Sequence, residues 1–147
     1  MSVTIRKANA EDQSACATLL AQLNEATGAD QAIDLGTAFD SMIDDTRGMI
    51  LLAIEDDHIL GMASCSFNLA LRYGGEYCQL EELIVTPEAR GKNVGALLMQ
   101  ACVSQATQRG CADFGLYLVP TTEHNRGFYE RFGFTALGTE MRQTLNG

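Results

Sequence analysis

The chain has 147 residues, of which 46% are hydrophobic and 20% are charged. This length suits one domain of roughly 100–200 residues with a buried core, and the low charge argues against intrinsic disorder. No apolar run approaches the roughly 18 residues that a membrane-spanning helix needs, and the N-terminus lacks the features of a signal peptide. We therefore expect a single cytoplasmic domain over residues 1–147, without a membrane partner.

The charge is negative and unevenly distributed. Nineteen acidic residues against ten basic residues give a net charge of -9, with -11 in residues 1–89 and +2 in residues 90–147. Nucleic-acid binding depends on neutralising phosphates with Lys and Arg, so the charge argues against a nucleic-acid partner. An acidic field attracts cations, although solubility alone explains it equally well.

The five cysteines form no C-x-x-C pair, and only two histidines accompany them, so no zinc-site spacing is present and no metal is expected. An odd number of cysteines among apolar neighbours indicates structural thiols in a reducing compartment, with a reactive thiol as the alternative. The cysteines are Cys16, Cys65, Cys78, Cys102 and Cys111.

The first third of the chain predicts one strand and two helices. Alternation of apolar and polar residues indicates a strand over residues 3–7. Asn9 can cap a helix that runs to Leu23, and a second helix is expected from about Asp30 to Asp45. The second helix would bury Ile33, Phe39, Met42 and Ile43.

The rest of the chain predicts strands that give way to alternating helices and strands. Apolar runs at 49–54 and 59–67 flank an acidic turn and indicate a hairpin with a longer loop. The remaining elements are strands over 77–85 and 114–119, helices over 93–108 and 120–133, and a closing strand or hairpin over 134–145.

The predicted order is therefore β-α-α-β-β-β-α-β-α-β. Hairpin connections favour antiparallel pairing in the first half, whereas the β-α-β passage over 77–119 requires a right-handed crossover onto a parallel strand. We expect an α/β (α+β) fold with a mixed central β-sheet flanked by helices.

Residues 81–96 combine a strand, a proline-containing loop and the run Gly-Lys-Asn-Val-Gly, which leads into a helix. Free N–H groups at a helix start attract anions, and glycine lets the backbone approach a phosphate closely. The segment matches neither a P-loop nor a dinucleotide-binding fingerprint. An ordinary strand-to-helix turn is the alternative to a phosphate site.

Two segments resemble the GNAT superfamily of N-acetyltransferases. The run R-G-K-N-V-G-A at 90–96 is similar to the family's acetyl-CoA loop, Q/R-x-x-G-x-G/A, and L-E-E-L-I-V-T-P-E at 80–88 is similar to its central strand. The run N-R-G-F-Y-E-R-F-G-F at 125–134 resembles the family's second cofactor motif. Asn93 replaces the first loop glycine, and Asn also tolerates left-handed backbone geometry.

The resemblance implies acetyl-CoA as co-substrate, bound where the strands at 77–85 and 114–119 splay apart. The pantetheine arm would pair with the backbone of Leu83, Ile84 and Val85. Asn125 would bond the pantetheine amides, and Tyr129 would reach the thioester sulfur. The pyrophosphate would lie on the loop formed by Arg90, Gly91, Lys92, Asn93, Val94, Gly95 and Ala96.

Direct transfer requires an uncharged amine, and a carboxylate can accept the amine's proton. Glu81 and Glu82 should point to opposite faces of a regular strand. Related polyamine-type members have their candidate base at the position that matches Glu81, so Glu81 is preferred, unless a bulge changes the facing. The Tyr129 hydroxyl would protonate the departing thiolate.

The predicted function is transfer of an acetyl group from acetyl-CoA to a primary amine, a small cationic acceptor or a peptide amine. The alternative is a non-catalytic acyl-CoA-binding or regulatory module on the same fold. Tyr73 and Glu76 are weaker candidates for the acceptor site. A homodimer is expected from the resemblance and from the apolar residues of the C-terminal segment, Phe134, Leu137, Met141 and Leu145.

Overall fold

In the computed structural model, residues 2–27 and 35–146 are described. They form two compact units, Met1–Leu116 and Tyr117–Gly147. The first unit holds the sheet and three of the helices, and the second holds a short helix and the C-terminal segment.

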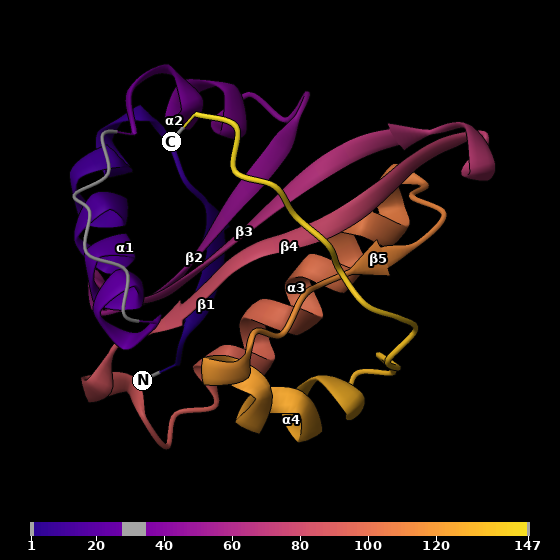
Figure 1. The fold of residues 1–147 in the computed structure, drawn as a ribbon. Coiled ribbons are helices and arrows are strands. Elements are labelled where there is room, and N and C mark those ends of the chain that lie inside the picture. The colour runs from indigo at the N-terminus through magenta and orange to yellow at the C-terminus, as the bar shows by residue number, and fades with distance from the viewer. Residues whose placement is uncertain (1, 28–34, 147) are drawn as a thin grey trace. The chain divides into compact units, whose positions relative to one another are not determined.

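The first unit is built on a five-stranded sheet in the order β1-β2-β3-β4-β5 (Figure 1). Neighbouring strands are antiparallel except β4 and β5, which are parallel. The mixed sheet and the α/β (α+β) class are thus confirmed. The strands are β1 (Thr4–Lys7), β2 (Gly48–Glu55), β3 (His58–Ala70), β4 (Gly75–Val85) and β5 (Phe114–Gly115).

Helices cover both faces of this sheet. The helices are α1 (Gln13–Thr27), α2 (Gly36–Ile43) and α3 (Val94–Arg109). Phe39 of α2 and Leu19 of α1 share a buried cluster with Met62 of β3. Cys65 faces the other way, and the neighbouring Cys102 of α3 raises the pKa of its thiol. Because successive strand residues alternate between faces, α1 and α2 cover one face and α3 covers the other.

The first helix begins as the sequence predicts. The Asn9 side chain accepts a hydrogen bond from the N–H of Glu11 (2.9 Å), and the Asp12 carboxylate accepts one from the N–H of Asn9 (2.8 Å). Asp12 also accepts two hydrogen bonds from Arg6, at 2.8 and 3.0 Å. This capping box opens a 3-10 turn (Ala10–Asp12) that continues into α1.

The second helix is confirmed only over α2. Phe39 is buried there, with 3% of its surface exposed, and Met42 and Ile43 pack against the same core. The N-terminal part of the predicted helix, residues 30–34 with Ile33, lies outside the described residues. The helix ends before Asp45, whose backbone is left-handed (φ 66°) and cannot continue it.

The hairpin between β2 and β3 is confirmed, but the expected longer loop is wrong. Glu55 pairs with His58, so only two residues form the turn. Asp56 and Asp57 both adopt left-handed conformations (φ 51° and 64°), which is the geometry of the tight turn that suits twisted antiparallel strands.

The strand predicted over 114–119 is also wrong in length. β5 pairs with β4 only through Phe114 with Cys78 and Gly115 with Gln79. From Leu80 onward, the β5-side edge of β4 has no strand partner within the first unit. The two strands therefore separate after one short parallel ladder.

The second unit contains a 3-10 helix (Pro120–Asn125) followed by α4 (Arg126–Glu130). These elements confirm a helical segment within 120–133. The closing strand predicted over 134–145 is wrong, because no strand ladder among the described residues includes that segment, and a strand requires a partner backbone. Its apolar side chains, Leu137, Met141 and Leu145, are exposed. No helix within the described residues is long and apolar enough to cross a membrane.

Candidate active site

A β-bulge interrupts the pairing of β3 with β4. Ser64 pairs with Glu82, but the next residue of β3, Cys65, pairs with Leu80. Glu81 is therefore the extra residue of β4, without a partner of its own in the ladder. A bulge of this kind re-aims the side chains around it.

The bulge brings both carboxylates to one face of the sheet. The Ser64 hydroxyl donates to Glu82, and the Ser66 hydroxyl donates to Glu81 (2.6 Å). Ser64 and Ser66 are two residues apart on β3 and so lie on the same face, the one covered by α1 and α2. The prediction that Glu81 and Glu82 point to opposite faces is wrong, because it assumed a regular strand.

The two carboxylates have different surroundings. Glu82 is half-buried beside buried Ser64, whereas Glu81 is exposed. Burial raises the pKa of Glu82 above its usual value. The Ser64 hydrogen bond acts in the opposite direction, and the charge of Glu81 adds to the increase. A carboxylate with a raised pKa is a stronger base near neutral pH.

Polar residues of β3 extend this cluster. Asn68 donates through its side-chain amide to the Ser66 hydroxyl (3.0 Å), which in turn donates to Glu81. Ser64, Ser66 and Asn68 alternate along β3, a pattern visible in the sequence. Sequence reasoning missed them because only the β3–β4 register connects them with the carboxylates.

β4 offers a free edge beside these carboxylates. Its backbone over Leu83, Ile84 and Val85 pairs with β3 on one side, but β5 ends before reaching them on the other. A ligand with amide groups can add to such an edge through main-chain hydrogen bonds, as an additional strand does.

The loop after β4 turns sharply into α3. Gly91 (φ 83°) and Asn93 (φ 63°) both adopt left-handed conformations, so Asn93 does provide the geometry expected of the family's glycine. Within the described part of the chain, the N–H groups of residues 93–96 have no hydrogen-bond acceptor. Unpaired N–H groups at the start of a helix, here one of 16 residues, can bind an anion.

The two cationic side chains of the loop after β4, Lys92 and Arg90, differ in whether they form an ion pair. Lys92 forms an ion pair with Glu55 at the end of β2 (2.5 Å). Arg90 is exposed and has no charged partner among the residues that the structure describes. Arg90 is therefore free to meet an anion at this loop.

Asn125 and Tyr129 belong to the second unit. Asn125 ends the 3-10 helix and Tyr129 lies four residues later in α4. Tyr129 is half-buried, with its ring at 5.1 Å from that of Phe128 and 6.1 Å from that of Phe134. Burial raises the pKa of the Tyr129 hydroxyl, which therefore keeps its proton at neutral pH.

Tyr73 and Glu76, the weaker candidates for the acceptor site, already have hydrogen-bond partners within the fold. The Tyr73 hydroxyl donates to Asp113 (2.7 Å). Glu76 accepts two hydrogen bonds from Arg109 (2.8 and 3.1 Å), and Arg109 also donates to the carbonyls of Asp45 and Thr46. These contacts join α3 to β4 and to the α2–β2 connection, which is a structural role.

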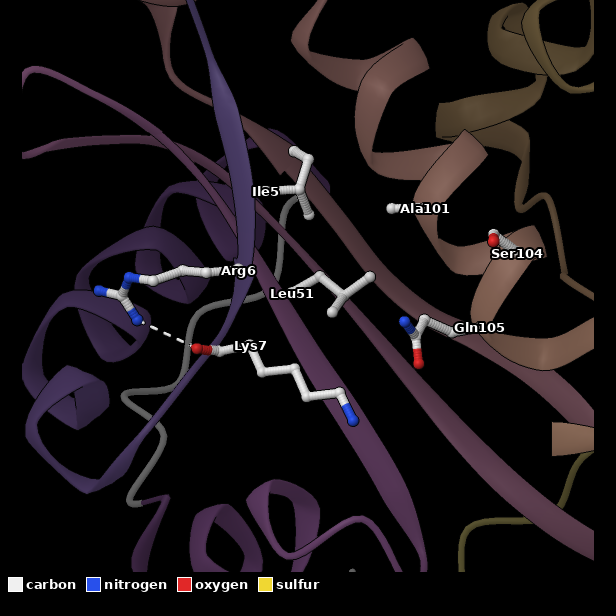
Figure 2. Close-up of a pocket in the computed structure, with 7 residues that line it drawn as sticks. All are labelled: Ile5, Arg6, Lys7, Leu51, Ala101, Ser104 and Gln105. Carbon is white, nitrogen blue, oxygen red and sulfur yellow. Dashed lines mark hydrogen bonds between the residues drawn. The ribbon is translucent and has the colours of Figure 1, made fainter. Parts of the chain in front are cut away.

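Two surface cavities lie away from the carboxylates. Figure 2 shows the smaller one, about 230 Å³, between β1, β2 and α3, where Arg6 extends away from α3 and donates to the Lys7 carbonyl. The larger one, about 510 Å³, lies between the β2–β3 turn and the loop after β4. Neither is lined by Glu81 or Glu82. Within 2–27 and 35–146, no group of His, Cys, Asp and Glu is arranged to hold a metal ion.

Comparison with protein families places this chain in a known class. The model of the acetyltransferase (GNAT) family matches residues 15–134. The chain belongs to this family.

Individual relatives are distant. A probable glucosamine 6-phosphate N-acetyltransferase 2 from Oryza sativa subsp. japonica is 27% identical over 106 residues, which span 62% of this chain and 62% of the rice protein. The chain thus matches less than two thirds of that relative's length.

Solved structures share the fold. A transcriptional regulator from Bacillus halodurans C-125 has a TM-score of 0.85 at 24% identity, with 97% of this chain and 99% of that chain covered. A predicted acetyltransferase from Clostridium acetobutylicum, solved with acetyl-CoA, has a TM-score of 0.79 at 18% identity, with 97% and 96% covered.

Proposed function

We propose that this protein transfers the acetyl group of acetyl-CoA to a primary amine. The observation that carries the proposal is the architecture of β4. This strand bears two carboxylates on one face, has an unpaired edge beyond Gln79, and ends at a loop with unpaired N–H groups. Family membership supports the same reaction class.

The free edge and the loop suit the two halves of acetyl-CoA. The pantetheine amides would pair with the backbone of Leu83, Ile84 and Val85, and Asn125 would bond the same arm. The pyrophosphate would accept hydrogen bonds from the amides of residues 93–96, with Arg90 as the nearby free cation. Bound acetyl-CoA supplies the thioester whose carbonyl carbon the amine attacks.

The amine arrives largely as an ammonium ion and must lose a proton before it attacks. We assign this proton to Glu82, directly or through a water molecule, because burial raises the pKa of this carboxyl above its usual value. Glu81, preferred from the sequence, is the alternative. After the C–N bond forms, the C–S bond breaks and the Tyr129 hydroxyl donates a proton to the CoA thiolate. The products are an N-acetyl amine and CoA.

The carboxylate face favours an acceptor that carries positive charge close to its reacting amine. Glu81, Glu82 and their serine and asparagine partners form a polar surface without a lysine or arginine hydrogen-bonded to it. Small polyamines, aminoglycosides and peptide amines have this character. The rice relative is named for glucosamine 6-phosphate, an amine with an anionic group, which makes that compound the informative contrast.

A non-catalytic acyl-CoA-binding or regulatory module on the same fold is the second candidate. Such a module would bind acetyl-CoA through the same edge and loop but would not need Glu82 or Tyr129. Turnover separates the two functions.

We also propose that the chain forms a single acetyltransferase domain that works as a homodimer in the cytoplasm. Free thiols at all five cysteines support a reducing compartment. The exposed side chains of Leu137, Met141 and Leu145 support self-association, which sedimentation at micromolar concentration tests.

The decisive experiment is an acceptor panel that detects released CoA thiol, with spermidine, an aminoglycoside, glucosamine 6-phosphate and a peptide amine. Reactions without acceptor provide the background from the protein's own cysteines. We expect acceptor-dependent CoA release with at least one cationic amine. Binding of acetyl-CoA without turnover on any amine would favour the non-catalytic module.

A further inference from the structure

Lys92 lies within the proposed phosphate loop, yet its ammonium group contacts a carboxylate from another part of the sheet. The Lys92 Nζ–Glu55 Oε1 distance is 2.5 Å, and 14% of the Glu55 side chain is exposed. A partly buried carboxylate this close cancels most of the field that Lys92 would otherwise present to an anion.

Direct packing of this loop against the core lies at its ends, where Ala89 and Val94 are buried, with 1% and 2% of their surfaces exposed. Lys92 stands between the left-handed residues Gly91 and Asn93, and a Cβ atom built on Gly91 would meet nothing within 4 Å. Asn93 makes no side-chain capping bond. The Lys92 N–H does donate to the Ala89 carbonyl (3.1 Å), but this bond lies within the loop and does not tie it to the sheet.

Glu55, in contrast, lies on a rigid support. It is the last residue of β2, pairs with His58, and precedes the two-residue turn of Asp56 and Asp57. The end of this hairpin and the loop together line the cavity of about 510 Å³. The ion pair therefore links the middle of the loop to the end of the hairpin across this cavity.

We propose that Glu55 is a positioning residue for acetyl-CoA binding, which acts through Lys92 to hold the loop so that the N–H groups of residues 93–96 face the pyrophosphate. Lys92 serves as the anchor of the loop, and Arg90 serves as the cation that meets the phosphates. This inference rests on the proposed function, since it assumes that the loop binds acetyl-CoA.

A double-mutant cycle in calorimetric titrations with acetyl-CoA tests the proposal. Glu55→Gln and Lys92→Met should each weaken binding by about fivefold, the range of a good ion pair, and the double variant should be no weaker than either. Saturating acetyl-CoA should restore the wild-type kcat of Glu55→Gln, so that only KM changes. Asp57→Asn is the matched control, since it removes the same charge from the same turn and should bind normally.

Three results would overturn the inference. Glu55→Gln could bind as tightly as the wild type, or more tightly, in which case the carboxylate is irrelevant or competes with the phosphates. Lys92→Met could weaken binding far more than Glu55→Gln, so that Lys92 touches the phosphates itself. Equal weakening by Asp57→Asn would indicate a general charge effect. Failure of the wild-type protein to bind acetyl-CoA would instead refute the proposed function.

Discussion

The carboxylates of Glu81 and Glu82 lie on the same face of β4, although the residues are adjacent in a strand. Each accepts a hydrogen bond from a serine of β3, Ser66 for Glu81 and Ser64 for Glu82, because the bulge at Glu81 shifts the register. The two carboxylates differ in exposure, and burial raises the pKa of the half-buried one, Glu82.

Glu82→Gln should lower kcat by about 100-fold, because the amide keeps the shape of the side chain but cannot accept the amine's proton. Higher pH should restore part of the activity, since more of the amine then arrives uncharged. Glu81→Gln is the matched control and should lose much less activity. The reverse ranking in steady-state assays would assign the base to Glu81.

Glu82→Gln should increase stability near neutral pH, although it lowers activity. The pKa of Glu82 is raised in the folded protein, so the folded state binds this proton more tightly than the unfolded state does. The stability that Glu82 contributes is therefore present below its unfolded pKa and is lost as pH rises through the raised value. The melting temperature of Glu82→Gln minus that of the wild type should be larger at pH 8 than at pH 4.5. A constant difference between the two proteins across this range would contradict the raised pKa.

Ser64→Ala should shift the pH dependence of activity. The Ser64 hydroxyl stabilises the charged form of Glu82, so its removal raises the pKa of that carboxyl further. The acidic limb of the kcat/KM profile should move to higher pH, with a greater loss of activity at pH 6 than at pH 8. Ser66→Ala, which alters the partner of Glu81, should leave the limb in place if Glu82 is the base.

Tyr129→Phe should lower kcat by about 100-fold, since it removes the proton donor and keeps the aromatic packing against Phe128 and Phe134. The affinity for acetyl-CoA should change little, and higher pH should not rescue the variant. Normal turnover with a verified acceptor would remove Tyr129 from the mechanism.

Local sequence signals predicted much of this fold. The Asn9 cap, the apolar side chains of α2 and the loop into α3 each depend on a few neighbouring residues, and all three are found in the structure. The mixed sheet followed from the alternation of strands and helices. These features need no knowledge of long-range pairing.

The errors concern interactions between distant segments. The bulge at Glu81 exists only in the register with β3, and the early end of β5 depends on its pairing with β4. The Lys92–Glu55 ion pair joins residues 37 positions apart. The length of a strand and the partner of an exposed charge are set by tertiary contacts, which no local pattern encodes.

The most direct test of the central claim is calorimetric titration of acetyl-CoA into the wild type and Gly95→Asp, with Gly138→Asp as the control. Gly95→Asp adds bulk and negative charge at the start of α3, whereas Gly138 is exposed with nothing within 4 Å of an added Cβ. Saturable binding by the wild type and Gly138→Asp, with none by Gly95→Asp, is the predicted result. Absence of binding by the wild type, or equal binding by Gly95→Asp, would contradict the placement of acetyl-CoA on this loop.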